Sequence, residues 1–152
     1  MKIITQGILL LMGCFLILSC SGKRPPNLGV SDGVFSQCPD KPNCVSSDAK
    51  DTQHQIQNYT LALASDEAWQ AVRQSVLELP KIKIVSESDG YLHAECSSAI
   101  FGFVDDLELH FRPDAGFIAI RSASRLGHSD FGVNRKRVEQ LRVMLTDQGV
   151  LE

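Results

Sequence analysis

Residues 101–124 read FGFVDDLELHFRPDAGFIAIRSAS, two strand-like runs separated by a turn. The turn is Pro113-Asp114-Ala115-Gly116, whose proline and glycine favour a tight reversal of the chain. This turn sets the register of an antiparallel hairpin, in which the paired residues of one face are Phe111 with Ile118, Leu109 with Ile120, Leu107 with Ser122 and Asp105 with Ser124. Because that face is mostly apolar, we predict that it lies on the core.

The opposite face of the same hairpin is predicted to be polar. Its charged and titratable members are Asp106, Glu108, His110, Arg121 and Arg125. In this register Glu108 lies directly opposite Arg121, and Asp106 is diagonal to both arginines. A shift by one residue would place Leu107 opposite Arg121 and mix the two faces, so we prefer the first register.

Further strands and two helices surround the hairpin. Ser65 is expected to cap a helix whose apolar residues keep helical spacing until Pro80, and a second helix is expected over 131–147. Strand-like runs cover 56–63, 82–86, 91–97, 101–111 and 117–124. The order β-α-β-β-β-β-α predicts an α+β domain, with an antiparallel sheet of about five strands and two helices on one face.

The final helix carries two polar residues on its apolar side. Asn134 and Arg137 fall within the arc that is predicted to face the sheet, where Asp105, Ser122 and Ser124 would meet them. A buried carboxylate without a partner is costly, so these groups should pair. We therefore predict an Asp105–Arg137 ion pair, with Asn134 and the two serines satisfying the remaining polar atoms.

The N-terminus has the pattern of a lipoprotein leader. Lys2 precedes the apolar run Ile8–Leu18, which is shorter than the roughly 18–20 residues of a membrane-spanning helix. The run ends in Ile17-Leu18-Ser19-Cys20, which resembles the bacterial lipobox. Lipidation of Cys20 with two or more acyl chains would hold the protein stably on a membrane. A plain secretory signal and an uncleaved anchor are the alternatives.

This leader sets the predicted organisation of the chain. Residues 1–19 are interpreted as the signal peptide, 20–36 as the lipidated cysteine with an extended tether, and 37–152 as a single globular domain. By resemblance to the sorting rules of enterobacterial lipoproteins, Ser21 favours the outer membrane. We expect the domain to lie on the periplasmic face of that membrane.

Two of the remaining cysteines are predicted to form a disulfide. Cys38 and Cys44 flank a short turn-rich segment, and the periplasm is an oxidising compartment. A zinc site is the rival interpretation, but a C-x5-C spacing without a second cysteine pair is a poor match. Cys96 alternates with apolar residues in a strand pattern and is interpreted as a buried thiol.

Composition excludes several classes of protein. The 152 residues are 43% hydrophobic and 22% charged, which suits one globular domain and not a disordered chain. A net charge of -3 argues against a protein whose surface binds nucleic acid, because such binding needs a basic surface. The sequence has no phosphate-binding loop, dinucleotide fingerprint or HExxH motif, so we predict neither a cofactor nor a metal.

A basic segment is the strongest candidate for a functional site. Residues 121–142 hold six positive and two negative side chains in an otherwise acidic protein. The predicted cluster consists of Asp105, Asp106, Arg121, Ser122, Ser124, Arg125, Asp130, Asn134, Arg135 and Arg137. Arginines and hydroxyls near a helix N-terminus suit the capture of a phosphate or carboxylate. The alternative is a structural network that ties the helix to the sheet.

Several stretches of the sequence resemble one family. They are RPPNLGV (24–30), CP (38–39) with PNCVSS (42–47), FGFVDD (101–106), and RSASR (121–125) followed by DFGVNRKR (130–137). Together they resemble family 1499 of the domains of unknown function, over about residues 24–145. The resemblance implies a bacterial envelope protein, often a lipoprotein, with no established activity.

We expect a non-catalytic outer-membrane lipoprotein that binds an anionic lipid, a peptidoglycan ligand or a protein partner. A hydrolase acting on an acidic envelope substrate is the alternative, and a purely structural protein is the third possibility. A catalytic pair at Asp105 and Asp106 is disfavoured because adjacent strand residues point to opposite faces. We expect no nucleic-acid partner.

Overall fold

The computed structural model describes residues 22–62, 65–98 and 102–152. The predicted signal peptide and Cys20 lie outside these residues. The elements are, in chain order, β1 (Val30–Ser31), β2 (Val34–Phe35), β3 (Cys44–Ser46), β4 (Tyr59–Thr60), α2 (Asp66–Glu78), β5 (Ile82–Ser88), β6 (Tyr91–Ser97), β7 (Val104–Arg112), the 3-10 turn η1 (Pro113–Ala115), β8 (Phe117–Ser124) and α3 (Val133–Asp147). The protein is α+β, as the sequence predicts.

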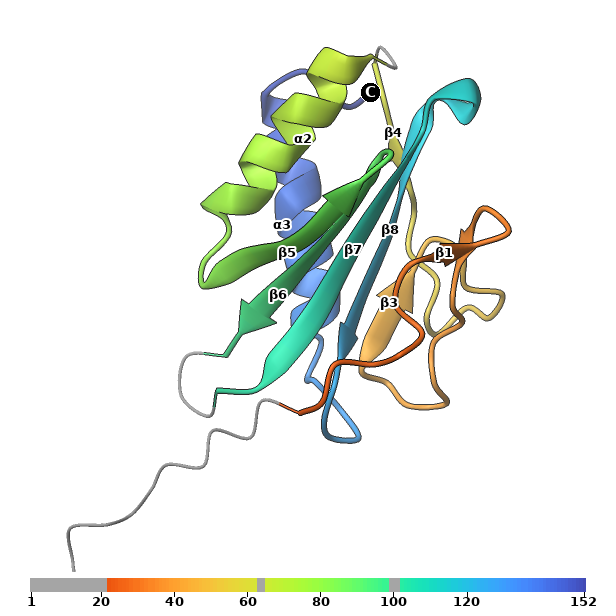
Figure 1. Ribbon diagram of the computed structural model, residues 1–152, viewed down its shortest axis with the longest axis vertical. Coiled ribbons are helices and arrows are strands. Elements are labelled where there is room, and N and C mark those ends of the chain that lie inside the picture. Colours follow the sequence, from red (N-terminus) through yellow and green to blue (C-terminus); the bar gives the residue numbers. More distant parts are fainter. Residues whose placement is uncertain (1–21, 63–64, 99–101) are drawn as a thin grey trace, which may run out of the picture.

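The main sheet is antiparallel and has six strands (Figure 1). Its order is β3-β8-β7-β6-β5, and β4 pairs with the other half of β8. The sheet gains a strand over the expected five because β3, which was not predicted, pairs with residues 121–123 of β8. The run predicted over 56–63 contributes only Tyr59–Thr60 as β4, since β3 already occupies half of that edge. Strands β1 and β2 form a separate hairpin.

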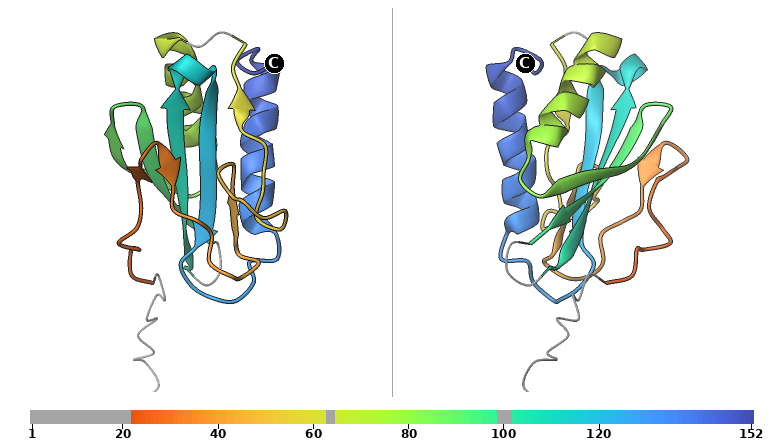
Figure 2. Two further views of the ribbon diagram at one scale, coloured as in Figure 1. Left: turned by 90° about the vertical axis from the view of Figure 1, so that its right-hand side faces the viewer. Right: turned by 60° about the vertical axis from the view of Figure 1, so that its left-hand side comes forward.

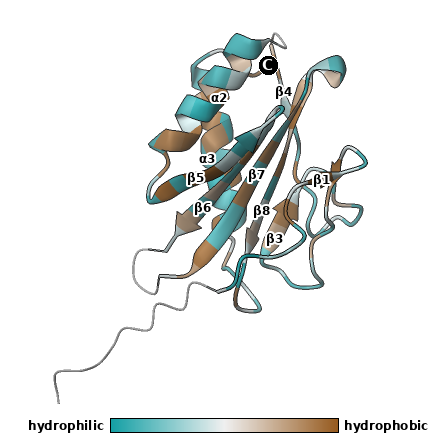
Figure 3. Ribbon diagram, viewed as in Figure 1, coloured by the Kyte–Doolittle hydropathy of each residue, from teal (hydrophilic) through white to brown (hydrophobic). Residues whose placement is uncertain are grey.

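The central hairpin has the predicted register. Strands β7 and β8 pair Glu108 with Arg121 and Phe111 with Ile118, and the reversal runs through η1. Gly116 ends the turn at φ 73°, a left-handed conformation that glycine adopts without a steric penalty. The alternating colours along β7 in Figure 3 show the resulting two-faced strand.

Both helices pack on the apolar face. Ser65 caps α2 by accepting a hydrogen bond from the N–H of Ala68 at 3.1 Å, and the helix ends before Pro80, as predicted. Helix α3 begins at Val133, two residues later than expected, because Phe131 and Gly132 have positive φ angles of 54° and 79°. The core between the helices and the sheet includes Val72, Val76, Leu92, Leu107, Leu109, Ile118, Ile120, Val138, Leu141 and Leu145.

The N-terminal segment lies against the opposite face. Figure 2 shows residues 22–35 on one side of the sheet and α3 on the other. Arg24 pairs with Glu95 of β6 at 2.7 Å, and the N–H of Gly29 donates to Glu108 of β7 at 2.7 Å. The expected tether is therefore wrong for residues 22–36. Polar groups of the sheet bind this segment, so it is part of the folded domain.

Candidate functional site

The predicted cluster divides into two sets on opposite faces of the sheet. On the helix side, Arg137 donates from Nη2 to Asp105 at 2.7 Å and from Nη1 to Asn134 at 2.7 Å and Ser122 at 3.0 Å. Ser122 also donates to the Asn134 side-chain oxygen at 2.6 Å. The Asp105–Arg137 pair and its polar partners are confirmed. These groups satisfy one another's hydrogen bonds, so this set links α3 to the sheet.

Asn134 also links α3 to the loops that contain Asp130 and Asn43. Its side-chain N–H groups donate to Ser124 at 2.9 Å, to Asp130 at 2.8 Å and to the carbonyl oxygen of Asn43 at 3.2 Å. Asp130 in turn accepts hydrogen bonds from the backbone N–H groups of Gly132 and Asn134, at 2.9 and 2.8 Å. Asp130 thus satisfies N–H groups at the start of α3.

Arg135 stands apart from both sets. It is exposed, and its Nη2 donates to the backbone carbonyls of Gln53 and Gln55, each at 3.1 Å. The single basic cluster that the sequence suggested is therefore three separate arrangements. The predicted alternation of the β7–β8 hairpin already places Asp105 and Asp106 on opposite faces, and the structure shows that the arginines divide in the same way.

On the outer face, Glu108 is the centre of a buried network. Its side chain lies 2.8 Å from Nη1 of Arg121 and also accepts hydrogen bonds from the Tyr91 hydroxyl at 2.8 Å and from the N–H of Gly29. Burial, followed by the charge of Glu108, raises the pKa of Tyr91 above its ordinary value, so the hydroxyl stays a donor. The carboxylate thereby fixes the guanidinium of Arg121 against the sheet.

Asp106 orients the second arginine. Arg125 binds it through two nitrogens, Nε at 2.9 Å and Nη2 at 2.6 Å, and Nη2 also contacts Glu95 at 2.6 Å. His93, on the neighbouring strand, lies 2.7 Å from Asp106. Burial alone would raise the pKa of Asp106, but the hydrogen bonds from Arg125 and His93 outweigh it and hold that pKa below its ordinary value. Asp106 is therefore ionised at neutral pH.

Three members of this outer network were not among the predicted site residues. Tyr91, His93 and Glu95 alternate along β6, so they share the face that carries Asp106 and Glu108 on β7. The same alternation identified the polar face of the β7–β8 hairpin. Extending the register from that hairpin to β6 would have found all three residues.

A pocket of about 380 Å³ lies over this network. Its lining includes three cationic side chains, Lys41, Arg121 and Arg125, and one carboxylate, Asp106. The two arginines do not use all their donors. Nη2 of Arg121 and Nη1 of Arg125 make no hydrogen bond to any described residue. The pocket thus combines fixed guanidinium groups with unused N–H donors.

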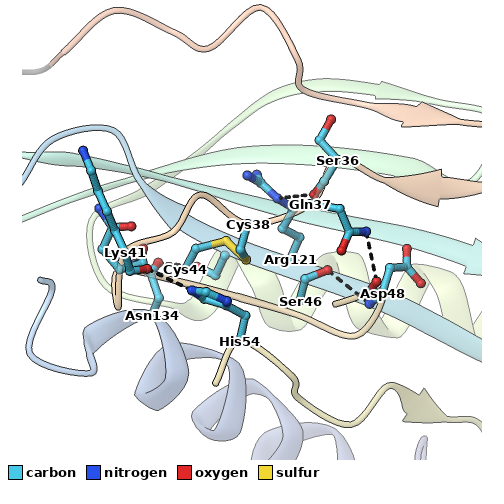
Figure 4. The surroundings of a disulfide bond; sticks show 12 residues. Ser36, Gln37, Cys38, Lys41, Cys44, Ser46, Asp48, His54, Arg121 and Asn134 are labelled. Atoms are coloured by element: carbon cyan, nitrogen blue, oxygen red, sulfur yellow. Dashed lines mark hydrogen bonds between the residues drawn. A yellow bond between two sulfur atoms is a disulfide. The ribbon is translucent and has the colours of Figure 1, made fainter. Parts of the chain in front are cut away.

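The loop closed by the disulfide contributes Pro39, Lys41 and Asn43 to the lining of this pocket. Figure 4 shows Lys41 beside the bond between Cys38 and Cys44. Cys38 and Cys44 are bonded, as predicted, and the loop that they close carries Lys41. His54 lies beneath the loop, with Nε2 at 3.0 Å from the Lys41 carbonyl and Nδ1 at 2.8 Å from Asp51. The backbone of the Lys41 loop is therefore held by a covalent bond and by a buried histidine.

Three further observations concern the free cysteine, metal ligands and membrane-spanning helices. Cys96 is buried, as predicted, and its burial raises the pKa of the thiol to about 11, so it stays protonated. Among residues 22–62, 65–98 and 102–152, no three His, Cys, Asp or Glu side chains converge as metal ligands. No helix in the same part of the chain is long and apolar enough to cross a membrane.

Comparison with known proteins identifies the family. The family model described as "Protein of unknown function (DUF1499)" matches residues 34–145, which is most of the chain. The matched region contains the disulfide, the wall of the pocket formed by Lys41, Arg121 and Arg125, and both polar networks except for the N–H of Gly29. No curated protein and no solved structure shows a significant match. The chain belongs to the DUF1499 family.

Proposed function

We propose that this protein is a lipoprotein of the bacterial outer membrane whose domain binds an anionic envelope component without catalysis. A lipid on Cys20 would hold it on the periplasmic face. The ligand would present a phosphate or carboxylate to the pocket over Arg121 and Arg125. One observation carries this proposal: both arginines line the pocket, and each has a terminal guanidinium nitrogen that no described residue binds.

The buried carboxylates support anion binding rather than oppose it. Glu108 and Asp106 hold the two guanidinium groups in fixed orientations, so a ligand would not have to order two long side chains. Arginine N–H groups match the oxygens of phosphate and carboxylate. Lys41 adds a third positive charge to the lining, and it is in none of the ion pairs among the described residues.

The proposal is limited to part of the basic segment that the sequence suggested. Arg137 is committed to Asp105, Asn134 and Ser122 on the helix side and does not line the pocket. Arg135 is committed to backbone carbonyls elsewhere. The proposed ligand therefore contacts the Arg121–Arg125 part of the basic segment alone.

The chemistry of the pocket supports binding without catalysis. Asp106 is the one carboxylate of its lining. Two hydrogen bonds from Arg125 keep this carboxylate ionised and occupy both of its oxygens, which does not suit a general acid or base. Ser124 is the one hydroxyl-bearing residue of the lining, and its oxygen already accepts a hydrogen bond from Asn134. A serine nucleophile would need a base at that oxygen instead.

Native mass spectrometry of residues 21–152, purified gently from periplasm, tests the binding proposal. We expect a bound anionic species that is lost in Lys41→Glu and retained in Lys50→Glu. Both lysines are exposed, so neither reversal of charge should unfold the domain, and Lys50 does not line the pocket. An unliganded wild-type domain, or a ligand that survives Lys41→Glu, would contradict the proposal.

The lipid anchor has a separate test. We expect the mature N-terminal peptide to carry the mass of a diacylglycerol and an acyl chain on Cys20. The Cys20→Ala variant should carry no acyl chain. A mature protein that begins at another residue would refute the anchor and leave the pocket proposal standing.

A further inference from the structure

The chain enters the domain beside the loop that joins β8 to α3. Gly22 packs so closely against this loop that a Cβ at Gly22 would lie 3.0 Å from Cβ of Arg125 and 3.1 Å from Cγ of Leu126. Cys20 precedes Gly22 by two residues, and an extended chain spans at most about 3.6 Å per residue, so their Cα atoms are within about 7 Å. A lipid on Cys20 would therefore hold this end of the domain at the membrane.

The same end exposes a concentration of apolar side chains. Leu126, Phe131 and Val133 lie within eight consecutive residues and are 42%, 91% and 46% exposed. Phe131 is the most exposed large hydrophobic residue of the described part of the chain. In Figure 1 this loop is at the lower end of the molecule, next to the first described residues. The apolar loop and the point of attachment thus share one end.

The backbone holds Phe131 outward against its conformational preference. Its φ is 54°, which is unfavourable for a bulky residue. The conformation is maintained because its N–H donates to Ser129 at 3.2 Å while Asp130 binds the N–H groups that follow. An exposed aromatic ring in a strained, well-held loop is costly in water, and burial in an apolar phase would offset that cost.

We propose that residues 126–133 dock into the bilayer surface beside the lipidated Cys20, with Leu126, Phe131 and Val133 among the headgroups. This inference rests on the lipid anchor of the proposed function. The occupant is a lipid bilayer because Cys20 is only two residues from Gly22, and Gly22 packs against Arg125 and Leu126 at the start of this loop, so the anchor would bring the loop to the membrane. Lys23 and Lys136 are exposed at the same end and suit anionic headgroups.

Docking would also orient the pocket. Gly127 belongs to the loop and lines the pocket that contains Arg121 and Arg125. A docked domain would therefore hold the proposed anion site close to the headgroup layer. The long axis of the sheet would rise from the membrane, with the C-terminal end of α3 remote from it (Figure 1).

Spin labelling of the full lipidated protein in vesicles of phosphatidylethanolamine and phosphatidylglycerol tests the docking. A nitroxide would be attached at Phe131→Cys or, as a matched control, at Val143→Cys, an exposed apolar residue of α3. The added cysteine is the reactive one, since Cys96 is buried and Cys38 is in the disulfide. We expect the label at 131 to be at least tenfold less accessible to a water-soluble nickel chelate than the label at 143.

Each outcome of this experiment decides the inference. If the protein floats with the vesicles and both labels are equally accessible to nickel, docking is refuted and the anchor stands. This is also the result expected if the loop binds a protein rather than lipid. If the protein neither carries acyl chains nor floats, the anchor fails and the docking inference fails with it. A label at 131 that is protected only in the anchored protein supports the inference.

Discussion

Removing either partner of the Asp105–Arg137 pair should destabilise the domain strongly. Asp105 is 9% exposed and the Arg137 side chain 14%, and their nearest atoms are 2.7 Å apart. Asp105→Asn leaves the guanidinium without a counter-charge, and Arg137→Met leaves the carboxylate without one. Breaking a buried pair in this way costs about 3–5 kcal/mol, and the residual exposure of both groups places the expected loss near about 3 kcal/mol for each variant.

The double variant distinguishes an ion pair from two independent contributions. With both charges removed, no uncompensated charge remains, so we expect a loss of about 4 kcal/mol rather than the sum of about 6. The coupling energy would then be about 2 kcal/mol. Urea unfolding followed by the fluorescence of Trp69 measures these losses, because Trp69 is the single tryptophan and stacks on Phe111 against the core.

The expected shifts are large on the scale of the assay. With a urea dependence of about 1–3 kcal/mol per molar, a loss of about 3 kcal/mol lowers the midpoint by roughly 1–3 M. Arg73→Met is a matched control, since Arg73 and Glu87 form an exposed pair in which the side chains are 38% and 36% accessible. That variant should cost less than about 1 kcal/mol. Losses that add within about 0.5 kcal/mol in the double variant would refute the reasoning.

Three further predictions concern the outer face and the disulfide loop. Glu108→Gln should lower the free energy of unfolding by about 3 kcal/mol in the same assay, because it leaves the buried Arg121 without its counter-charge. A loss below about 1 kcal/mol would show that the network around Glu108 does not stabilise the fold. Burial alone would lower the pKa of His54, but hydrogen bonds to Asp51 and the Lys41 carbonyl hold that pKa above its ordinary value. The contribution of His54 to the free energy of unfolding is therefore complete below about pH 6.5, the ordinary pKa of histidine. It is lost as the pH rises through the pKa of His54 in the folded state. The urea midpoint measured across this range should fall more steeply in the wild type than in His54→Gln, and parallel curves would contradict the assignment. Replacing both cysteines of the Cys38–Cys44 bond by serine should cost about 2 kcal/mol, measured as a lower thermal midpoint that the wild type reproduces on reduction.

The two polar networks explain why a small domain buries so much charge. Each buried carboxylate on the outer face has at least two donors, and several of these come from the N-terminal segment or from β6. The segment therefore does more than connect an anchor to a domain. It covers the polar face and completes the hydrogen bonding of groups that would otherwise be costly to bury.

The hairpin and the helix-side ion pair could be predicted from the sequence for a local reason. Side chains of a strand alternate between two faces, so the turn at Pro113–Gly116 sets which residues share a face. The helical period then places Arg137 on the apolar side of α3, where a lone charge requires a partner. The disulfide could also be predicted, because Cys38 and Cys44 are close in the sequence. Each of these inferences depends on local information: the register of a hairpin, the period of a helix or a short spacing.

Only the tertiary structure decided how residues 22–36 lie and which arginines keep a free donor. The N-terminal segment has no sustained apolar period, so its position depends on contacts such as Arg24 with Glu95, which are far away in the sequence. Strand β3 exists because the edge of β8 is available to it, which no local propensity reports. The unused nitrogens of Arg121 and Arg125 depend on the set of partners around each guanidinium, and packing brings these partners together from three segments of the chain: the N-terminal segment, β6 and β7.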